Sequence, residues 1–516
     1  MKLKIAMIGA GSIGFTRRLM HDILAVPELQ DATFAFTDVN PANLDMVTRL
    51  CRRDITANRL PARIEASRDV RRSVADADYV FCMIRQGGLE AFQSDIDIPL
   101  RYGIDQCVGD TLNPGGIMYA QRTIPVILEF CRHIREAAKP QALFLNYSNP
   151  MAMNTWACNR YGKVRTVGLC HGVQGAHRQI AQCIERYAKS HGLIGEEETL
   201  ERKDVEVTCA GINHQTWFIK VSWRGIDMVP KLPALFAAHP EYSRTEKVRI
   251  DVLKRFGYYS TESNGHLSEY LPWYRKRTKD IRKWIDFTSW IHGETGGYLR
   301  VCTEGRRWFE TDFPNWMKET PPQIEGGKRS QEHGSWIIEA LETGRIYRGH
   351  FNVVNAGHIT NLPDGCIVEI PGYVDRTGIN MPTVGKLPLA CAATCSASVR
   401  VQEMSVEAAV HGDVSLLKQA MLHDPLSGAV CDPEEIWQMA DEMLLAQRTW
   451  LPQYRSEMRP AENRLKKHSR EGTRVKRRGT QGAARRKIKS IREMARDRVA
   501  AAENAQAADK GRMTKS

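Results

Sequence analysis

Short apolar runs alternate with helix-like segments over the first 150 residues. The run KIAMI stops at Gly9 and is followed by RRLMHDIL, whose apolar residues recur with a helical period. Comparable runs follow in TFAFTDVN, ADYVFCMIRQGG and QALFLNYSNP. Apolar strands that alternate with amphipathic helices are typical of a parallel sheet covered by helices. The pattern therefore predicts an α/β protein with a Rossmann-type N-terminal domain.

The first turn of this pattern predicts a dinucleotide site. Gly9, Gly11 and Gly14 follow a strand and open a helix, with the spacing GxGxxG, and Ser12 lies among them. Such glycines let a pyrophosphate approach the backbone and the N-terminus of the helix. Asp38 ends the second apolar run, where an acid accepts hydrogen bonds from a ribose. We therefore expect NAD rather than NADP.

Two further strand ends supply candidates for the same crevice. Gln86 follows the run that starts at ADYVF, and Asn146 ends the run ALFLN. Ligands of open parallel sheets bind at the carboxyl ends of the strands. We expect Gln86 beside the cofactor and Asn146 as a cofactor or structural partner. The Gly87-Gly88 pair is equally consistent with an ordinary tight turn.

Composition indicates a large globular protein with reduced thiols. The chain has 516 residues and is 42% hydrophobic, which is enough for two or three domains. Its first residues are too broken by glycine to form a signal peptide or a membrane span, so we expect a cytoplasmic protein. The 13 cysteines are scattered singly, which argues against a disulfide framework.

Nearly all of the net charge lies in the last 61 residues. Residues 456–516 hold 19 lysines and arginines against 7 aspartates and glutamates, which is +12 of the net charge of +13. This segment has few residues that could form a core, so we expect a disordered or weakly helical tail. Because it lacks stacking aromatic residues, nucleic-acid binding is the less favoured interpretation.

The stretch GLCHGVQG places a thiol beside an imidazole in a glycine-lined turn. Cys170 could be a metal ligand, although a buried cysteine beside a helix-capping histidine is the commoner arrangement. His214 follows the strand-like run VEVTCAGIN and is a second candidate ligand. Thiolate and imidazole also suit zinc or iron, so residue types alone leave the metal open.

Several stretches together resemble glycoside hydrolase family 4, whose members depend on NAD and manganese. They are IGAGSIGF, GDTLNPGGIMYAQRTIP, NYSNPMAMNTWA, GLCHGVQG, CAGINHQTWF and GYYSTESNGHLSEYLPWY. The resemblance covers about residues 1–455. It implies a fold related to lactate and malate dehydrogenases, with a Rossmann-type domain at 1–200, a mixed α+β substrate and metal domain at 201–455, and the basic tail at 456–516.

The resemblance also implies an unusual hydrolysis. In the family's scheme the sugar is oxidised at C3, a base removes the C2 proton, the aglycone leaves C1 by elimination, water adds, and C3 is reduced again. The stretches are most similar to those of members that hydrolyse α-galactosides such as melibiose. Gly172 departs from the best-known member of that group, in which serine follows the histidine, and leaves α-galacturonides, α-glucuronides and α-glucosides as alternatives.

The family's functional residues fall on specific positions of this chain. Cys170 and His214 match the Mn²⁺ ligands, and Asn149 matches a substrate-binding asparagine, with Asp110 as the next substrate candidate. His171 is a candidate acid.

The base is expected on a helix downstream of the metal histidine. Asp251 is its first candidate and Tyr258 the second, while Glu262 and His266 could line the same pocket. The family also implies a homodimer or homotetramer.

Two other classes of protein remain open from the sequence. A Rossmann fingerprint alone also fits a dehydrogenase that releases NADH. The basic tail alone fits a nucleic-acid-binding protein, whose binding would depend strongly on salt.

Overall fold

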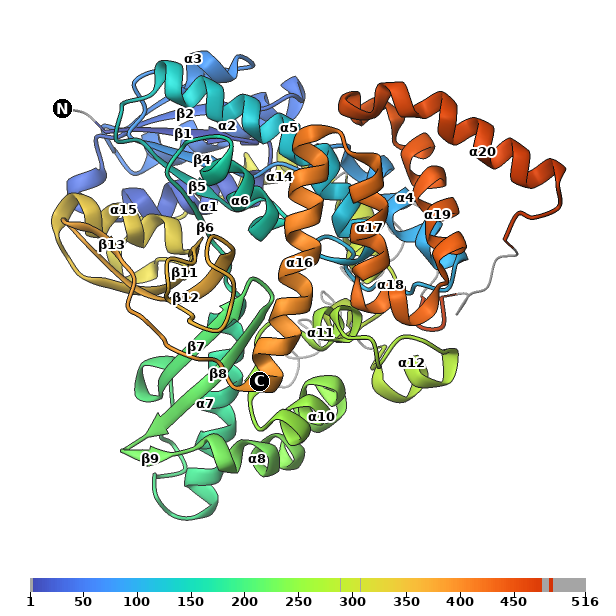
Figure 1. Cartoon of the computed structure of the whole chain (residues 1–516). Coiled ribbons are helices and arrows are strands. Elements are labelled where there is room, and N and C mark those ends of the chain that lie inside the picture. Colours follow the sequence, from blue (N-terminus) through green and yellow to red (C-terminus); the bar gives the residue numbers. More distant parts are fainter. Residues whose placement is uncertain (1–2, 288, 307, 476–481, 486–516) are drawn as a thin grey trace, which may run out of the picture.

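One mixed sheet runs through the molecule (Figure 1). The structure is a computed structural model that describes residues 3–287, 289–306, 308–475 and 482–485. The main path of the sheet has the order β10-β8-β7-β12-β11-β6-β5-β4-β1-β2-β3, with β13 beside β12 and β9 beside β8.

The N-terminal half of the sheet is parallel. Its strands are β1 (Lys4–Ile8), β2 (Thr33–Thr37), β3 (Arg63–Ser67), β4 (Tyr79–Cys82), β5 (Leu143–Asn146) and β6 (Thr166–Gly168). Their spatial order, β3-β2-β1-β4-β5-β6, is that of two mononucleotide-binding halves joined at β1 and β4. The prediction of a Rossmann-type N-terminal fold is confirmed.

The sheet continues in antiparallel pairing beyond β6. These strands are β7 (Glu206–Ile212), β8 (Gln215–Trp223), β9 (Ile226–Asp227), β10 (Tyr259–Ser260), β11 (Tyr347–Val354), β12 (Ile367–Asp375) and β13 (Gly378–Asn380). Asn352 of β11 pairs with Gly168 of β6, so residues after 200 extend the same sheet. The mixed α+β C-terminal part is confirmed, while the domain boundaries at 200 and 455 stay predictions.

Helices cover both faces of the parallel half and surround the antiparallel half. Those before residue 200 are α1 (Ile13–Leu24), α2 (Pro41–Ala57), α3 (Val70–Val74), α4 (Gly88–Arg101), α5 (Asn113–Ala137), α6 (Met151–Arg160) and α7 (Gly172–Ser190). The middle of the chain forms α8 (Leu232–Ala238), α9 (Tyr242–Thr245), α10 (Lys247–Phe256), α11 (Asn264–Tyr270), α12 (Thr278–Trp284), α13 (Gly297–Gly305), α14 (Trp308–Trp316) and α15 (His333–Thr343). The last helices are α16 (Leu389–His411), α17 (Val414–His423), α18 (Pro425–Val430), α19 (Pro433–Ala446) and α20 (Met458–Arg470).

Alternate residues of the central strands feed two cores. Ile5 and Met7 of β1 join the cluster under α1, α2 and α15, whereas Ala6 and Ile8 join the cluster under α5. This alternation is the two-residue period of a strand buried on both faces. The parallel pairing of β1 with β2 and β4 brings the carboxyl ends of these strands to the same edge of the sheet.

Helices α16 to α20, drawn in orange and red, lie together from the centre to the right of the view in Figure 1. Helix α16 packs against α5, α6 and α17 in the largest core cluster. Of the expected basic tail, α20 lies on α19 and buries Ala461, while residues 476–481 and 486–516 lie outside the described residues. Within the described residues, every helix is too short or too polar to cross a membrane.

Candidate functional site

A cavity of about 800 Å³ opens at the carboxyl ends of the parallel strands. It runs from the first glycine turn to the β7–β8 hairpin. The predicted site residues that line it are Gly9, Gly11, Ser12, Asp38, Gln86, Asp110, Asn149, Cys170, His171 and His214. The structure therefore brings the cofactor, substrate and metal candidates together in one space.

One end of this cavity is a glycine cradle. Gly9 has a φ of +86°, and a Cβ there would lie 2.5 Å from the Met83 carbonyl oxygen. A Cβ on Gly11 would lie 2.6 Å from Oδ2 of Asp38, which accepts a hydrogen bond from the Gly11 N–H at 2.8 Å. Only glycine fits at either position, and the turn leads into the N-terminus of α1. The residues present thus fit a dinucleotide.

Two of the predicted cofactor residues lie outside the cavity lining. Gly14 lies in the first turn of α1, where a Cβ would have no neighbour within 4 Å. The Asn146 side chain is fully buried and exchanges hydrogen bonds with the backbone of Ser148, at 3.0 and 3.1 Å. Asn146 therefore shapes the turn that carries Asn149. This matches the structural role that the sequence left open for Asn146 beside a cofactor role.

Asp110 lies at the centre of the cavity wall. Its Oδ2 accepts a hydrogen bond from Asn149 Nδ2 at 2.9 Å and lies 3.9 Å from Arg85. The Arg85 guanidinium is held against three aromatic rings, those of Phe92, Tyr119 and Tyr298. These side chains present both donors and acceptors to a polyhydroxylated ligand.

Arg85 was missed in the sequence. Its signal was a cation three residues after the end of the apolar strand β4, at the edge of the sheet where ligands bind.

The two expected metal ligands, Cys170 and His214, also line the cavity. Cys170 follows β6, and burial raises the pKa of its thiol well above the usual range. His214 lies in the two-residue turn between β7 and β8, with a φ of +64°. A histidine in the left-handed region is uncommon, and such strain concentrates at functional sites.

Hydrogen bonds fix the tautomer of His214. Nδ1 of His214 lies 2.8 Å from the Thr111 hydroxyl, which donates its only proton to Asp110 Oδ1 at 2.9 Å. Thr111 must therefore accept a proton from Nδ1, which leaves Nε2 unprotonated. A histidine that donates through one nitrogen and binds through the other is the common arrangement in metal sites.

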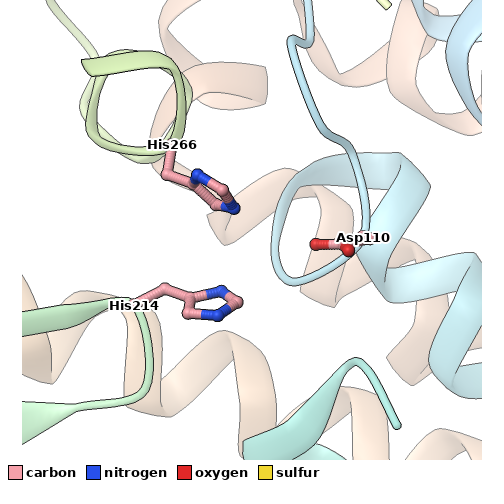
Figure 2. A group of neighbouring side chains, drawn as sticks. All are labelled: Asp110, His214 and His266. Atoms are coloured by element: carbon pink, nitrogen blue, oxygen red, sulfur yellow. The ribbon is translucent and has the colours of Figure 1, made fainter. Parts of the chain in front are cut away.

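Glu262 and His266 complete the polar cluster around His214. Figure 2 shows Asp110, His214 and His266 converging from a loop, a hairpin turn and a helix. One ligand atom from each lies within 4.8 Å of the others, and the same holds for Cys170, His214 and Glu262. The residues present thus fit a divalent metal ion.

Electrostatics differ sharply within this cluster. Burial would raise the pKa of Glu262, but the imidazoles of His214 and His266 lower it to about 2. Burial lowers the pKa of His266 to about 4. The cluster therefore holds an ionised carboxylate beside a neutral imidazole at neutral pH.

His171 lies at the mouth of the cavity. It is the N-cap residue of α7, its side chain is 68% exposed, and its Nδ1 lies 3.6 Å from Glu332 Oε1. Hydrogen bonding to Glu332 raises the pKa of this imidazole. This position suits a proton donor to the departing part of a substrate.

The two expected bases are not brought to the cavity. Asp251 on α10 accepts hydrogen bonds from Arg255 Nε at 2.8 Å and from the Tyr274 hydroxyl at 2.9 Å. Tyr258 is half-buried against the largest core cluster. Neither residue is among those that line the cavity.

The structure therefore defines a Rossmann-type protein with a dinucleotide cradle and a metal-ligand cluster in one cavity. Two family models match it: "Family 4 glycosyl hydrolase" over residues 4–186 and "Family 4 glycosyl hydrolase C-terminal domain" over residues 209–427. The chain belongs to the family 4 glycosyl hydrolases, as its motifs predicted.

Individual relatives agree with this assignment. An α-galactosidase of Rhizobium meliloti is 56% identical, over 96% of this chain and 98% of its own length. An α-galactosidase of Bacillus subtilis is 33% identical, over 88% of this chain and 100% of its own.

A solved structure shares the fold. The 6-phospho-β-glucosidase of Thermotoga maritima, with manganese, NAD⁺ and glucose-6-phosphate, has a TM-score of 0.67 and 23% identity, and the match covers 87% of this chain and 99% of that one.

Proposed function

We propose that this glycoside hydrolase is an α-galactosidase that uses NAD and Mn²⁺. The observation that carries the proposal is that the glycine cradle and the metal-ligand cluster face one cavity. The 56% identity to an α-galactosidase over nearly the whole chain supports the substrate. A dinucleotide site beside a metal site is what hydrolysis by transient oxidation requires.

The residues divide into three groups along the cavity. Gly9, Gly11 and Asp38 hold the dinucleotide, and Cys170 and His214 hold the metal. When bound, NAD would accept and return a hydride, and the metal would polarise the sugar oxygens as a Lewis acid.

Between these groups lie the side chains that bind the sugar. Asn149 and Arg85 both contact Asp110, and all three residues line the cavity. Their donors and acceptors orient the hydroxyl groups of the ring. Aromatic rings on three sides hold the Arg85 guanidinium in place.

Proton transfers fall to two histidines. His266 lines the cavity, and its Nδ1 lies 2.7 Å from the Ser263 hydroxyl. In the tautomer that donates from Nδ1 to Ser263, Nε2 is the nitrogen that accepts a proton. We assign to it the removal of the C2 proton, in place of Asp251 and Tyr258. His171 at the mouth donates a proton to the leaving oxygen of the aglycone.

An α-galacturonidase is the second candidate. A uronic acid carries a carboxylate, and the cavity wall presents the Arg85 guanidinium, which is the side chain that best binds carboxylates. Asp110 lies 3.9 Å from Arg85 and already neutralises it, which favours the uncharged galactoside. A cytoplasmic location and a homodimer or homotetramer complete the proposal.

A panel of 4-nitrophenyl glycosides tests the proposal. The purified chain, with NAD⁺, Mn²⁺ and a reductant, is offered the α-galactoside, α-galacturonide, α-glucuronide and α-glucoside. We expect the α-galactoside to be cleaved fastest, and omission of NAD⁺ or addition of a chelator to abolish cleavage. NADH should not accumulate. Stoichiometric NADH without nitrophenol release would indicate a dehydrogenase instead, and preference for the uronide would select the second candidate.

A further inference from the structure

We infer that Glu262 is a third protein ligand of the divalent metal, beside Cys170 and His214. This inference rests on the proposed function, because the metal itself belongs to that proposal. Oε1 of Glu262 lies 3.3 Å from Cys170 Sγ and 3.8 Å from His214 Nε2. The nitrogen that faces Glu262 is thus the one that the Thr111 contact leaves unprotonated.

The spacing of these atoms is that of ligands around one ion. A first-row divalent metal holds nitrogen, oxygen and sulfur at about 2.0–2.3 Å, so neighbouring ligand atoms lie about 3–3.6 Å apart. The contacts of Glu262 Oε1 fall in or just above this range. Without metal, the Cys170 thiol donates a hydrogen bond to Oε1, and an ion would replace that proton.

The backbone of Glu262 adopts a strained conformation. Its φ is +66°, a left-handed conformation that disfavours a glutamate. Among the described residues, its ion-pair contacts within 4.0 Å are to the imidazoles of His214 and His266, and none is to a lysine or arginine. An opposite charge stabilises a largely buried carboxylate, and a divalent cation would supply that charge.

Gly172 makes room for this carboxylate. A Cβ on Gly172 would lie 1.6 Å from Oε1 of Glu262, so every other residue would displace the carboxylate. Gly172 is also the first residue of α7, whose N-terminal dipole favours a negative charge. The third residue of the Cys-His-Gly sequence is therefore explained by Glu262, which lies 90 positions further along the chain.

A different role would be to orient His266. Oε2 of Glu262 lies 3.8 Å from His266 Nδ1, and Ser263 also contacts that nitrogen at 2.7 Å. In that case the carboxylate would position an imidazole and leave the metal untouched. A measurement of metal affinity distinguishes the two roles, because only a metal ligand should change it, and it needs no measurement of turnover.

The test uses Mn²⁺ affinity and Co²⁺ spectroscopy on the metal-stripped full chain, in the absence of substrate. In Glu262→Gln we expect the Mn²⁺ Kd, measured by equilibrium dialysis, to rise at least about 10-fold. The visible d–d bands of bound Co²⁺ should change, while the near-ultraviolet thiolate charge-transfer band remains. Gly172→Ala should shift both readouts in the same direction, because it moves the carboxylate without removing it.

Glu332→Gln is the matched control, because Glu332 is a buried carboxylate that contacts His171 and not the metal candidates. Its Mn²⁺ Kd should stay within about twofold of the wild type. Unchanged Kd and d–d bands in both Glu262→Gln and Gly172→Ala would overturn the inference. A wild-type chain that binds no metal, or a charge-transfer band that survives in Cys170→Ser, would instead contradict the metal site of the proposed function.

Discussion

At the scale of single residues, Thr111 has the clearest indirect effect on the site. Its hydroxyl links Asp110 of the substrate wall to Nδ1 of His214. We expect Thr111→Val to raise the Mn²⁺ Kd by about 10-fold, because the imidazole loses the acceptor that fixes its tautomer. Thr111→Ser keeps the hydroxyl and should bind Mn²⁺ as the wild type does. Equal Mn²⁺ Kd values for the wild type and both variants would show that Thr111 does not affect metal binding.

Asp38 carries the second prediction at this scale. Its carboxylate lines the cradle and accepts a hydrogen bond from the Gly11 N–H, and among the described residues none of its hydrogen bonds is to Asp110 or the metal-ligand candidates. Asp38→Ala should therefore raise the Kd for NAD⁺ by about 10-fold or more and change the KM for the glycoside by less than about twofold. Calorimetric titration with NAD⁺ measures the first value. An unchanged NAD⁺ affinity would remove Asp38 from the cofactor site.

Sequence reasoning found the site residues that carry a local motif. Gly9, Gly11 and Asp38 follow strands at fixed spacing, and Cys170 and His214 lie within two motifs of the family. Glu262 was noticed only as a possible lining residue. Its place beside Cys170 depends on a turn in the left-handed region, which a single sequence does not reveal.

At the scale of elements, a buried ion-pair cluster joins α1 to α2. Asp54 of α2 accepts hydrogen bonds from Arg17 and His21 of α1 and from its neighbour Arg53, and its side chain is fully buried. Although burial alone would raise it, these partners lower the pKa of Asp54 to about 2. The cluster thus stabilises the two helices that border the dinucleotide cradle.

We expect Asp54→Asn to lower the free energy of unfolding by about 2 kcal/mol at pH 7. Because the folded pKa is depressed, this contribution is complete above the unfolded pKa of 3.8 and is lost as pH falls toward about 2. Urea unfolding at several pH values should show the difference between the two chains shrinking below about pH 4. Asp45→Asn, an exposed position of the same helix, is the control and should cost less than about 0.5 kcal/mol. A constant difference down to pH 3 would contradict the assignment.

The elements were predicted best where apolar residues are continuous. Strands β1, β2, β4 and β5 are buried on both faces and stand out as apolar runs. Strand β3 was not predicted, because it lies at the edge of the sheet and its sequence RIEAS is mostly exposed. For Asp251, the helix itself was predicted, but the side chain faces Arg255 and Tyr274 rather than the cavity.

At the scale of the whole molecule, the parallel half follows from the order of apolar runs, whereas the antiparallel extension does not. Strand β6 is only three residues long, yet it joins the two halves through one residue pair with β11, about 180 positions away. Such long-range pairing leaves no local signal in the sequence. The cavity forms near this junction, so residues from both halves meet there.

The C-terminal segment contacts the rest of the molecule more closely than its composition indicated. Arg464 of α20 makes two hydrogen bonds to the buried carboxylate of Asp441, at 2.8 and 2.9 Å, and Lys418 reaches the same group at 2.7 Å. Deletion of residues 456–516 should lower the Tm by about 2 °C or more, whereas deletion of 486–516 should not change it. Arg464→Ala in the full chain isolates the ion pair. Equal Tm values for both deletions would show that α20 adds no stability.

Hydrogen exchange at the sugar reports on the whole assembled site. If the C2 proton is removed and the ring is then restored, hydrolysis in D₂O should place deuterium at C2 of the released galactose, which NMR detects. Direct displacement at C1 never breaks that bond.

The identity of the base can be tested in the same assay. Because His266 lines the cavity and Asp251 does not, His266→Gln should lower the rate of hydrolysis by about 100-fold, and Asp251→Asn should keep both the rate and the deuterium label. Loss of activity in Asp251→Asn, with an intact fold by circular dichroism, would indicate that Asp251 on α10 is the base. Galactose without deuterium, formed by an enzyme that also works without NAD⁺, would exclude the oxidation and elimination route.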